Sequence, residues 1–94
     1  MVNYKIRYST RAKIDLANIF DYIALDNPKK AEEFTKSIEQ YIIDLAHFPY
    51  IGNEDSKTKR RKLVKHPYII YYAVMEHAQI IKIETIRHGA RRPL

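Results

Sequence analysis

The sequence predicts an α+β fold in the order β-α-α-β-β-β, with a helix hairpin packed on one face of a mainly antiparallel four-stranded sheet. Two observations predict it. Apolar residues recur at helical spacing between residues 11 and 48, and runs rich in β-branched and aromatic residues occupy 3–8 and 60–88. A chain of 94 residues provides one hydrophobic core, so residues 1–94 are expected to form a single domain.

The first strand is predicted at 3–8, where Tyr4, Ile6 and Tyr8 alternate with polar neighbours. Ser9 and Thr10 then offer an N-cap, because a side-chain oxygen can accept from a free N–H of the first helical turn. The helix that follows is expected to end near Leu25. Its apolar stripe consists of Ala12, Leu16, Ile19, Phe20 and Ile23, and the helical carboxylates, Asp15 among them, are expected to lie on solvated faces.

A second helix is predicted from Asn27-Pro28, because asparagine caps well and proline suits the first helical position. It should end at Phe48-Pro49. The link between the helices is short, which predicts an antiparallel hairpin. Its apolar stripe comprises Ala31, Phe34, Ile38, Tyr41, Ile42 and Leu45.

The rest of the chain is predicted to be an exposed loop followed by three strands. Residues 53–58 are polar and are expected to form the loop, and the strands are expected at 60–66, 68–75 and 79–88. The run 68–75 is apolar on both faces, which predicts a central strand. Residues 76–78 are few enough to join the last two strands as an antiparallel hairpin, and 89–94 form a tail.

The formal net charge of +6 is concentrated in the second half of the chain. Residues 1–48 contain seven Lys/Arg and seven Asp/Glu, whereas 49–94 contain ten against four. Such segregation is typical of a protein with a polyanionic partner, nucleic acid or acidic protein, although a solubilising surface has the same composition.

Several classes of function are excluded by residues that the sequence lacks. It has no cysteine, so disulfides and thiolate chemistry are ruled out, and its two glycines cannot form a phosphate-binding loop. Its four histidines show no metal-ligand spacing, so neither a metal nor another cofactor is expected. No apolar run is long enough for a signal peptide or a membrane span, which predicts a cytoplasmic protein without a membrane partner.

The ordered set of local motifs resembles the RelE/ParE superfamily of toxins, over essentially the whole chain. The matching segments are Arg11 to Leu16, Ile19 to Ile23, Leu45 to Gly52, Arg61 to Leu63, Tyr68 to Tyr72 and the closing Ile86-Arg87-His88-Gly89-Ala90-Arg91-Arg92-Pro93. The closing segment is most similar to the ParE-type, plasmid-stabilisation branch. The resemblance implies a growth-inhibiting toxin of a type II toxin–antitoxin system, which a cognate antitoxin holds inactive in a hetero-oligomer.

The resemblance leaves three functions open. The ParE branch implies a toxin that binds DNA gyrase and blocks replication without covalent chemistry of its own. The RelE branch implies an endoribonuclease that cuts mRNA in the ribosome. The third alternative is a non-toxic remnant that only binds its antitoxin. RelE-type members often carry an aromatic residue near the C-terminal end, and here none follows His88, which favours the gyrase interpretation.

Candidate site residues differ between the two toxin mechanisms. For the RNase, His88 would transfer a proton, while Arg61 and Arg87 would stabilise the charge on the phosphate. A lone histidine at a strand end more often caps or packs that end than takes part in catalysis. For target binding the candidates are Lys57, Lys59, Arg60, Lys62, Arg91 and Arg92. The cluster at 57–65 is also what an edge strand needs to deter unwanted pairing.

Overall fold

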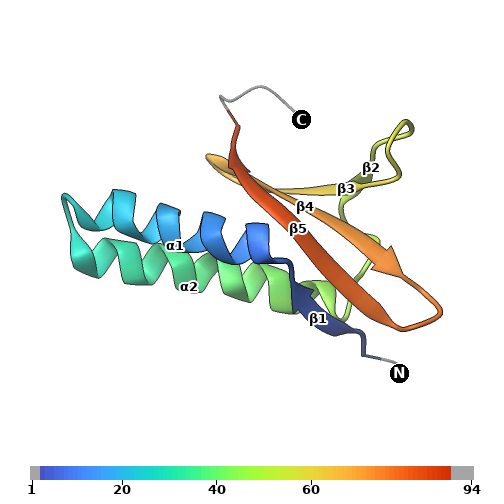
Figure 1. Cartoon of the computed structure of the whole chain (residues 1–94). Coiled ribbons are helices and arrows are strands. Elements are labelled where there is room, and N and C mark those ends of the chain that lie inside the picture. The colour runs from blue at the N-terminus through green and yellow to red at the C-terminus, as the bar shows by residue number, and fades with distance from the viewer. Residues whose placement is uncertain (1–2, 90–94) are drawn as a thin grey trace.

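The computed structural model describes residues 3–89 and has two layers, a helix pair and a mixed sheet (Figure 1). The elements are β1 (Lys5–Tyr8), α1 (Thr10–Ala24), α2 (Pro28–Leu45), β2 (Asn53–Glu54), β3 (Arg61–Lys65), β4 (Tyr68–Met75) and β5 (Ile80–His88). The predicted α+β fold and its β-α-α-β-β-β order are confirmed. Within the described part of the chain, neither helix combines the length and apolar character needed to cross a bilayer.

The sheet has five strands, in the order β1-β5-β4-β3-β2, so the expectation of four strands was wrong. The additional strand, β2, pairs with β3 through only two residues and lies inside the segment predicted as a loop. A strand that short leaves no alternation for a sequence pattern to detect. β1 pairs with β5 in parallel, and the other pairs are antiparallel. The apolar β4 is central, as its composition predicts.

Both helices begin at the predicted caps. The Ser9 side chain accepts from the N–H of Ala12 at 2.9 Å, and that of Asn27 accepts from the N–H of Lys30 at 3.0 Å. Pro28 follows as the first residue of α2. The two helices lie side by side, and the end of the hairpin that contains their connection extends beyond the sheet (Figure 1).

The core lies between the helix pair and one face of the sheet. Fully buried side chains come from α2 and from the central strands, and include Ile38, Ile42, Leu45, Ile70, Tyr72, Ile81 and Ile83. In the described part of the chain, no helix covers the opposite face of the sheet (Figure 1). We call it the open face; it includes the exposed Val64 of β3 and the exposed Lys82 of β5.

α1 completes the hydrogen bonding of β5 where β1 ends. The Ser9 hydroxyl donates to the carbonyl of Glu84 at 2.7 Å. The Asp15 carboxylate accepts from the Thr85 hydroxyl at 2.6 Å and from the backbone N–H of Ile86 at 3.0 Å. Asp15 is only 9% exposed, so the expectation that it lies on a solvated face was wrong. A charged side chain is tolerated on the buried stripe because the Thr85 hydroxyl and the Ile86 N–H of β5 both donate to the Asp15 carboxylate.

Candidate functional site

The predicted target-binding lysines lie on a folded loop between β2 and β3. Asp55 organises this loop, because its carboxylate accepts from the N–H of Lys57 at 2.9 Å and its carbonyl accepts from the N–H of Lys59 at 2.8 Å. The hydrogen bond from Lys57 also lowers the pKa of the Asp55 carboxyl. Lys57 and Lys59 are exposed, and the loop projects from the sheet (Figure 1). The loop backbone that carries these two exposed lysines is therefore held by hydrogen bonds to Asp55.

Arg61 holds the segment between α2 and β2. Its guanidinium donates to the carbonyl of Gly52 at 2.7 Å and to that of Tyr50 at 3.3 Å, and lies 4.7 Å from the centroid of the Tyr50 ring. Tyr50 in turn donates to Glu76, which raises the pKa of the Tyr50 hydroxyl. Arg61 is thus engaged by backbone carbonyls and an aromatic ring.

Tyr72 fixes the same segment from the core. Its hydroxyl donates to the carbonyl of Pro49 at 2.9 Å and accepts from the N–H of Gly52 at 2.9 Å. Burial raises the pKa of this hydroxyl. We call the loop between β2 and β3, which carries Lys57 and Lys59, the basic loop. The segment that leads into it is therefore anchored from both sides, by Arg61 and by Tyr72.

Arg87 and His88 lie at the other end of the sheet. In the register, Arg61 pairs with Tyr72, whereas His88 pairs with Tyr68. Four residues along β4 separate these positions, which corresponds to roughly 13 Å. The structure brings Arg87 and His88 together but does not bring Arg61 to them. The His88 ring packs edge-on against Tyr68, with centroids 5.3 Å apart.

A groove of about 760 Å³ runs between α1 and the end of β5. Arg87 and His88 line it together with apolar side chains and residues of α1. The full lining is Arg11, Asp15, Asn18, Ile19, Tyr22, Pro67, Tyr68, Ile86, Arg87 and His88. The Nε of Arg87 is buried and has no hydrogen-bond partner among the described residues. The groove therefore combines apolar side chains with a buried guanidinium nitrogen, Nε of Arg87, that has no acceptor in residues 3–89.

Arg60 and Lys62 turn toward the open face. Lys62 is exposed, and Arg60 forms an ion pair with Glu84, with its Nε 2.7 Å from the carboxylate. Sequence reasoning missed two further cations on this face, Arg7 and Lys82. They are neighbours in the register between β1 and β5. Arg91 and Arg92, also predicted to bind the target, lie outside the described residues.

Comparison with known proteins places the chain in a family. The model of the family described as "ParE toxin of type II toxin-antitoxin system, parDE" matches residues 6–93. Toxin RelE2 of Caulobacter vibrioides is 32% identical over 87 residues, which cover 93% of this chain and 97% of that protein.

Solved structures share the fold. The toxin–antitoxin complex RelBE2 from Mycobacterium tuberculosis contains a chain with a TM-score of 0.72 at 18% identity, covering 93% of this chain and 99% of its own. The chromosomal ParDE system from P. aeruginosa gives a TM-score of 0.76 at 22% identity, covering 90% and 95%. The chain belongs to the ParE toxin family of type II toxin–antitoxin systems, within the RelE/ParE superfamily.

Proposed function

We propose that this toxin acts by binding DNA gyrase and blocking replication, rather than by cutting RNA. The observation that supports this most is the separation of the candidate catalytic groups. The Arg61 guanidinium donates a hydrogen bond to the carbonyl of Gly52. The strand positions of Arg61 and His88 are separated by roughly 13 Å along β4. A phosphoryl-transfer site needs its proton donor and its cations around one phosphate. The projecting lysines instead suit a protein that binds its target.

The basic loop is the part of the toxin that we expect to contact gyrase. Replacing Lys57 and Lys59 together with glutamate should relieve the inhibition of supercoiling by at least tenfold in toxin concentration, since two contacts of about 1 kcal/mol each are lost and reversed. The measurement is a supercoiling assay with purified gyrase. Lys29 and Lys30 at the start of α2 are also exposed, so reversing both is the matched control and should leave inhibition unchanged.

His88 distinguishes this proposal from the RNase alternative. We expect His88→Ala to retain gyrase inhibition within a few-fold, because a gyrase-binding toxin needs no proton transfer and would lose only the contact of His88 with Tyr68. In an RNase it would be a proton-transfer group, and its loss would cost about 10²–10⁴ in the rate of mRNA cleavage. Ribosome-dependent cleavage that disappears in His88→Ala, with gyrase unaffected by the parent protein, would contradict the proposal.

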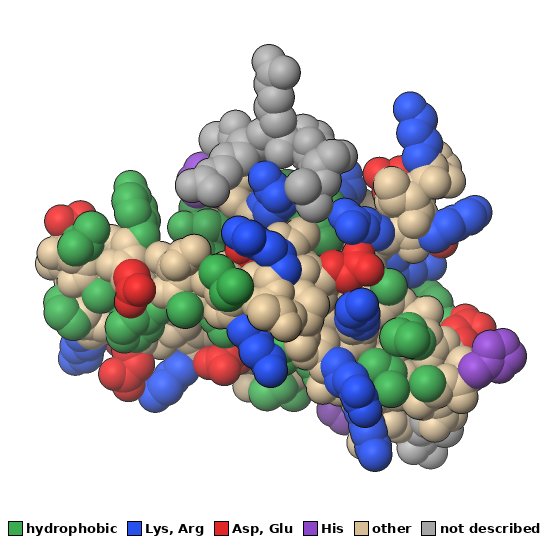
Figure 2. Space-filling model, in the orientation of Figure 1, with side chains coloured by type: hydrophobic (Ala, Val, Ile, Leu, Met, Phe, Trp, Pro, Cys, Tyr) green, Lys and Arg blue, Asp and Glu red, His purple; other side chains and the backbone are tan. Residues whose placement is uncertain are grey.

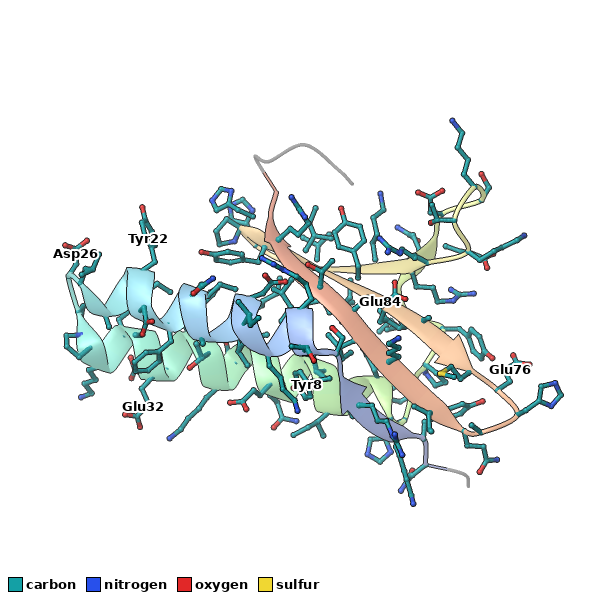
Figure 3. All side chains as sticks on the ribbon, viewed as in Figure 1. Tyr8, Tyr22, Asp26, Glu32, Glu76 and Glu84 are labelled. Atoms are coloured by element: carbon teal, nitrogen blue, oxygen red, sulfur yellow. The ribbon has the colours of Figure 1, made fainter. Side chains whose placement is uncertain are left out.

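We further propose that a cognate antitoxin binds in the groove between α1 and β5. The groove suits a segment that carries both acidic and apolar side chains. An acidic side chain would pair with Arg87, whose Nε lacks an acceptor among the described residues, and an apolar one would cover Tyr22, which is 72% exposed at the rim. Figure 3 shows Tyr22 pointing away from the hairpin. The candidate partner is the product of a short neighbouring reading frame with an acidic, helix-forming C-terminal segment.

Co-expression tests the groove directly. The neighbouring gene product should restore growth to cells that express the toxin but should fail with the double variant Tyr22→Ala, Arg87→Ala, which we expect to remain toxic. Tyr41→Ala on α2, which removes another exposed tyrosine, serves as the control and should still be neutralised. Full neutralisation of the double variant would place the antitoxin elsewhere.

A further inference from the structure

Two residues other than glycine adopt a left-handed backbone conformation in the part of the chain that the structure describes. Lys59, in the basic loop, has a φ of 65°, and Gln79, in the turn between β4 and β5, has a φ of 54°. This region is crowded for any residue with a Cβ, because the Cβ approaches the following carbonyl oxygen. Glycine, or less often asparagine, ordinarily occupies such positions. Each of these two turns therefore stores strain that a glycine would relieve.

The backbone hydrogen bonds of the basic loop require the left-handed conformation of Lys59. Its N–H donates to the carbonyl of Asp55 at 2.8 Å, and the carbonyl of the next residue, Arg60, accepts from the N–H of Asp55 at 2.7 Å. The chain must therefore reverse direction at Lys59 in order to enter β3. A turn that closes in this way commonly has glycine at the reversal. Here the position holds a lysine, although the fold uses only its backbone.

No ion pair among the described residues offsets the strain at Lys59. The side chain is exposed, and its ammonium joins none of the ion pairs formed within residues 3–89. Lys57 and Arg60 lie within two positions of it, so its charge adds repulsion to the loop. Figure 2 shows Lys and Arg side chains standing out from the projecting loop. Neither the turn geometry nor the charges around it favour a lysine at this position.

Lys57 differs from Lys59 both in conformation and in the compensation of its charge. Lys57 is not among the residues with a positive φ. The pKa of the Asp55 carboxyl is lowered first by the hydrogen bond from the N–H of Lys57, and further by the charges of Lys62 and Lys57. Asp55 thus compensates part of the charge of Lys57, whereas Lys59 is not among the groups that lower this pKa. Of the two exposed lysines of the basic loop, Lys59 has the charge that is less compensated within the described chain.

We propose that Lys59 is the stronger of the two lysine contacts that the basic loop makes with an anionic group of its target, and that the toxin gives up stability to keep it. The inference rests on the proposed function, which identifies the target as gyrase, and assigns the contact to one residue. Strained backbone is typical of functional positions, where the side chain is needed for binding and the rest of the fold holds the conformation. Lysine suits this role because its compact ammonium can pair with a carboxylate or a phosphate.

Two glycine variants test the inference. Lys59→Gly and Gln79→Gly each remove a crowded Cβ from an exposed turn, so both should raise the Tm by roughly 2–6 °C. Their effects on gyrase should differ. Lys59→Gly should weaken the inhibition of supercoiling about fivefold, which corresponds to one lost contact, whereas Gln79→Gly should leave it unchanged. An unchanged Tm in Lys59→Gly, or full inhibition by it, would overturn the proposal.

Two glutamine variants separate charge from strain. Lys59→Gln removes the charge and keeps the Cβ, so it should weaken inhibition about fivefold while the Tm stays close to that of the parent protein. Lys57→Gln removes the neighbouring charge and should weaken inhibition less. Equal losses in the two glutamine variants would show that the lysine at the reversal has no special role, which would also overturn the proposal.

Binding of fluorescently labelled toxin to gyrase, with and without DNA, identifies the anionic group. A loss in Lys59→Gln that is present with gyrase alone assigns the contact to a carboxylate of the protein, and a loss that requires DNA assigns it to a phosphate. Growth arrest at matched expression keeps the inference separate from the choice of target. A parent protein that arrests growth without inhibiting gyrase would show that the proposed target is wrong. In that case, full growth arrest by Lys59→Gly would overturn the inference, and reduced arrest with an increased Tm would support it.

Discussion

Replacing Asp15 with alanine should lower the free energy of unfolding by about 3 kcal/mol, equivalent to a fall in Tm of about 15 °C for a domain of this size. The carboxylate is 9% exposed and accepts hydrogen bonds from Thr85 and from the backbone of Ile86. Alanine leaves both donors buried without an acceptor, which costs more than the loss of an exposed hydrogen bond. Thermal and chemical denaturation measure the effect.

Asp21 on the same helix supplies the control. It is exposed, and alanine there removes the same carboxylate from the same helix without leaving a buried donor unpaired. We expect Asp21→Ala to change the free energy of unfolding by less than about 0.5 kcal/mol. If the two alanine variants were equally stable, the contact between α1 and β5 through Asp15 would contribute nothing measurable.

Replacing Gly52 with alanine should cost about 2–3 kcal/mol of stability through steric conflict. A Cβ at this position would lie 2.6 Å from the carbonyl oxygen of Lys62 and 2.7 Å from the hydroxyl of Tyr72. The first is backbone of β3 and the second is a buried group that already holds the N–H of Gly52. Neither can move without disturbing the sheet, and urea denaturation would report the loss.

Gly89→Ala is the comparison for this variant. There a Cβ would come no closer than 3.2 Å to the carbonyl of Pro67, and its next contact is at 3.8 Å. A shift of a few tenths of an ångström accommodates it, so the cost should stay below about 1 kcal/mol. Equal destabilisation by the two alanines would show that Gly52 is not tightly enclosed.

Local patterns predicted the helices well, because each helix carries its own apolar stripe and its own cap. They failed at Asp15, because an acidic residue type predicts exposure whereas its position in the helix predicts burial. Position 15 lies three residues after Ala12 and four before Ile19, which places it on the buried stripe. The spacing alone thus indicated burial, and only the acidic side chain argued against it.

The site was harder to predict, because its residues meet through pairing between distant segments. The lysines of the basic loop are close together in the sequence, so their clustering can be predicted from the sequence alone. Arg7 and Lys82 are adjacent only because β1 pairs with β5, and no local pattern reports a parallel pairing over that separation. Arg61 illustrates the converse, since nothing in a run of cations distinguishes the one that binds backbone carbonyls.

The position of β5 in the fold determines how late in synthesis the sheet can be completed. β5 is the last strand in chain order, yet β1, β4 and α1 all depend on it for hydrogen bonds. During synthesis, the earlier elements emerge without the strand that joins them, and β1 has no partner until residues 80–83 follow. The open face and the groove both require β5. A nascent chain therefore has neither surface until β5, the last described strand, has been translated.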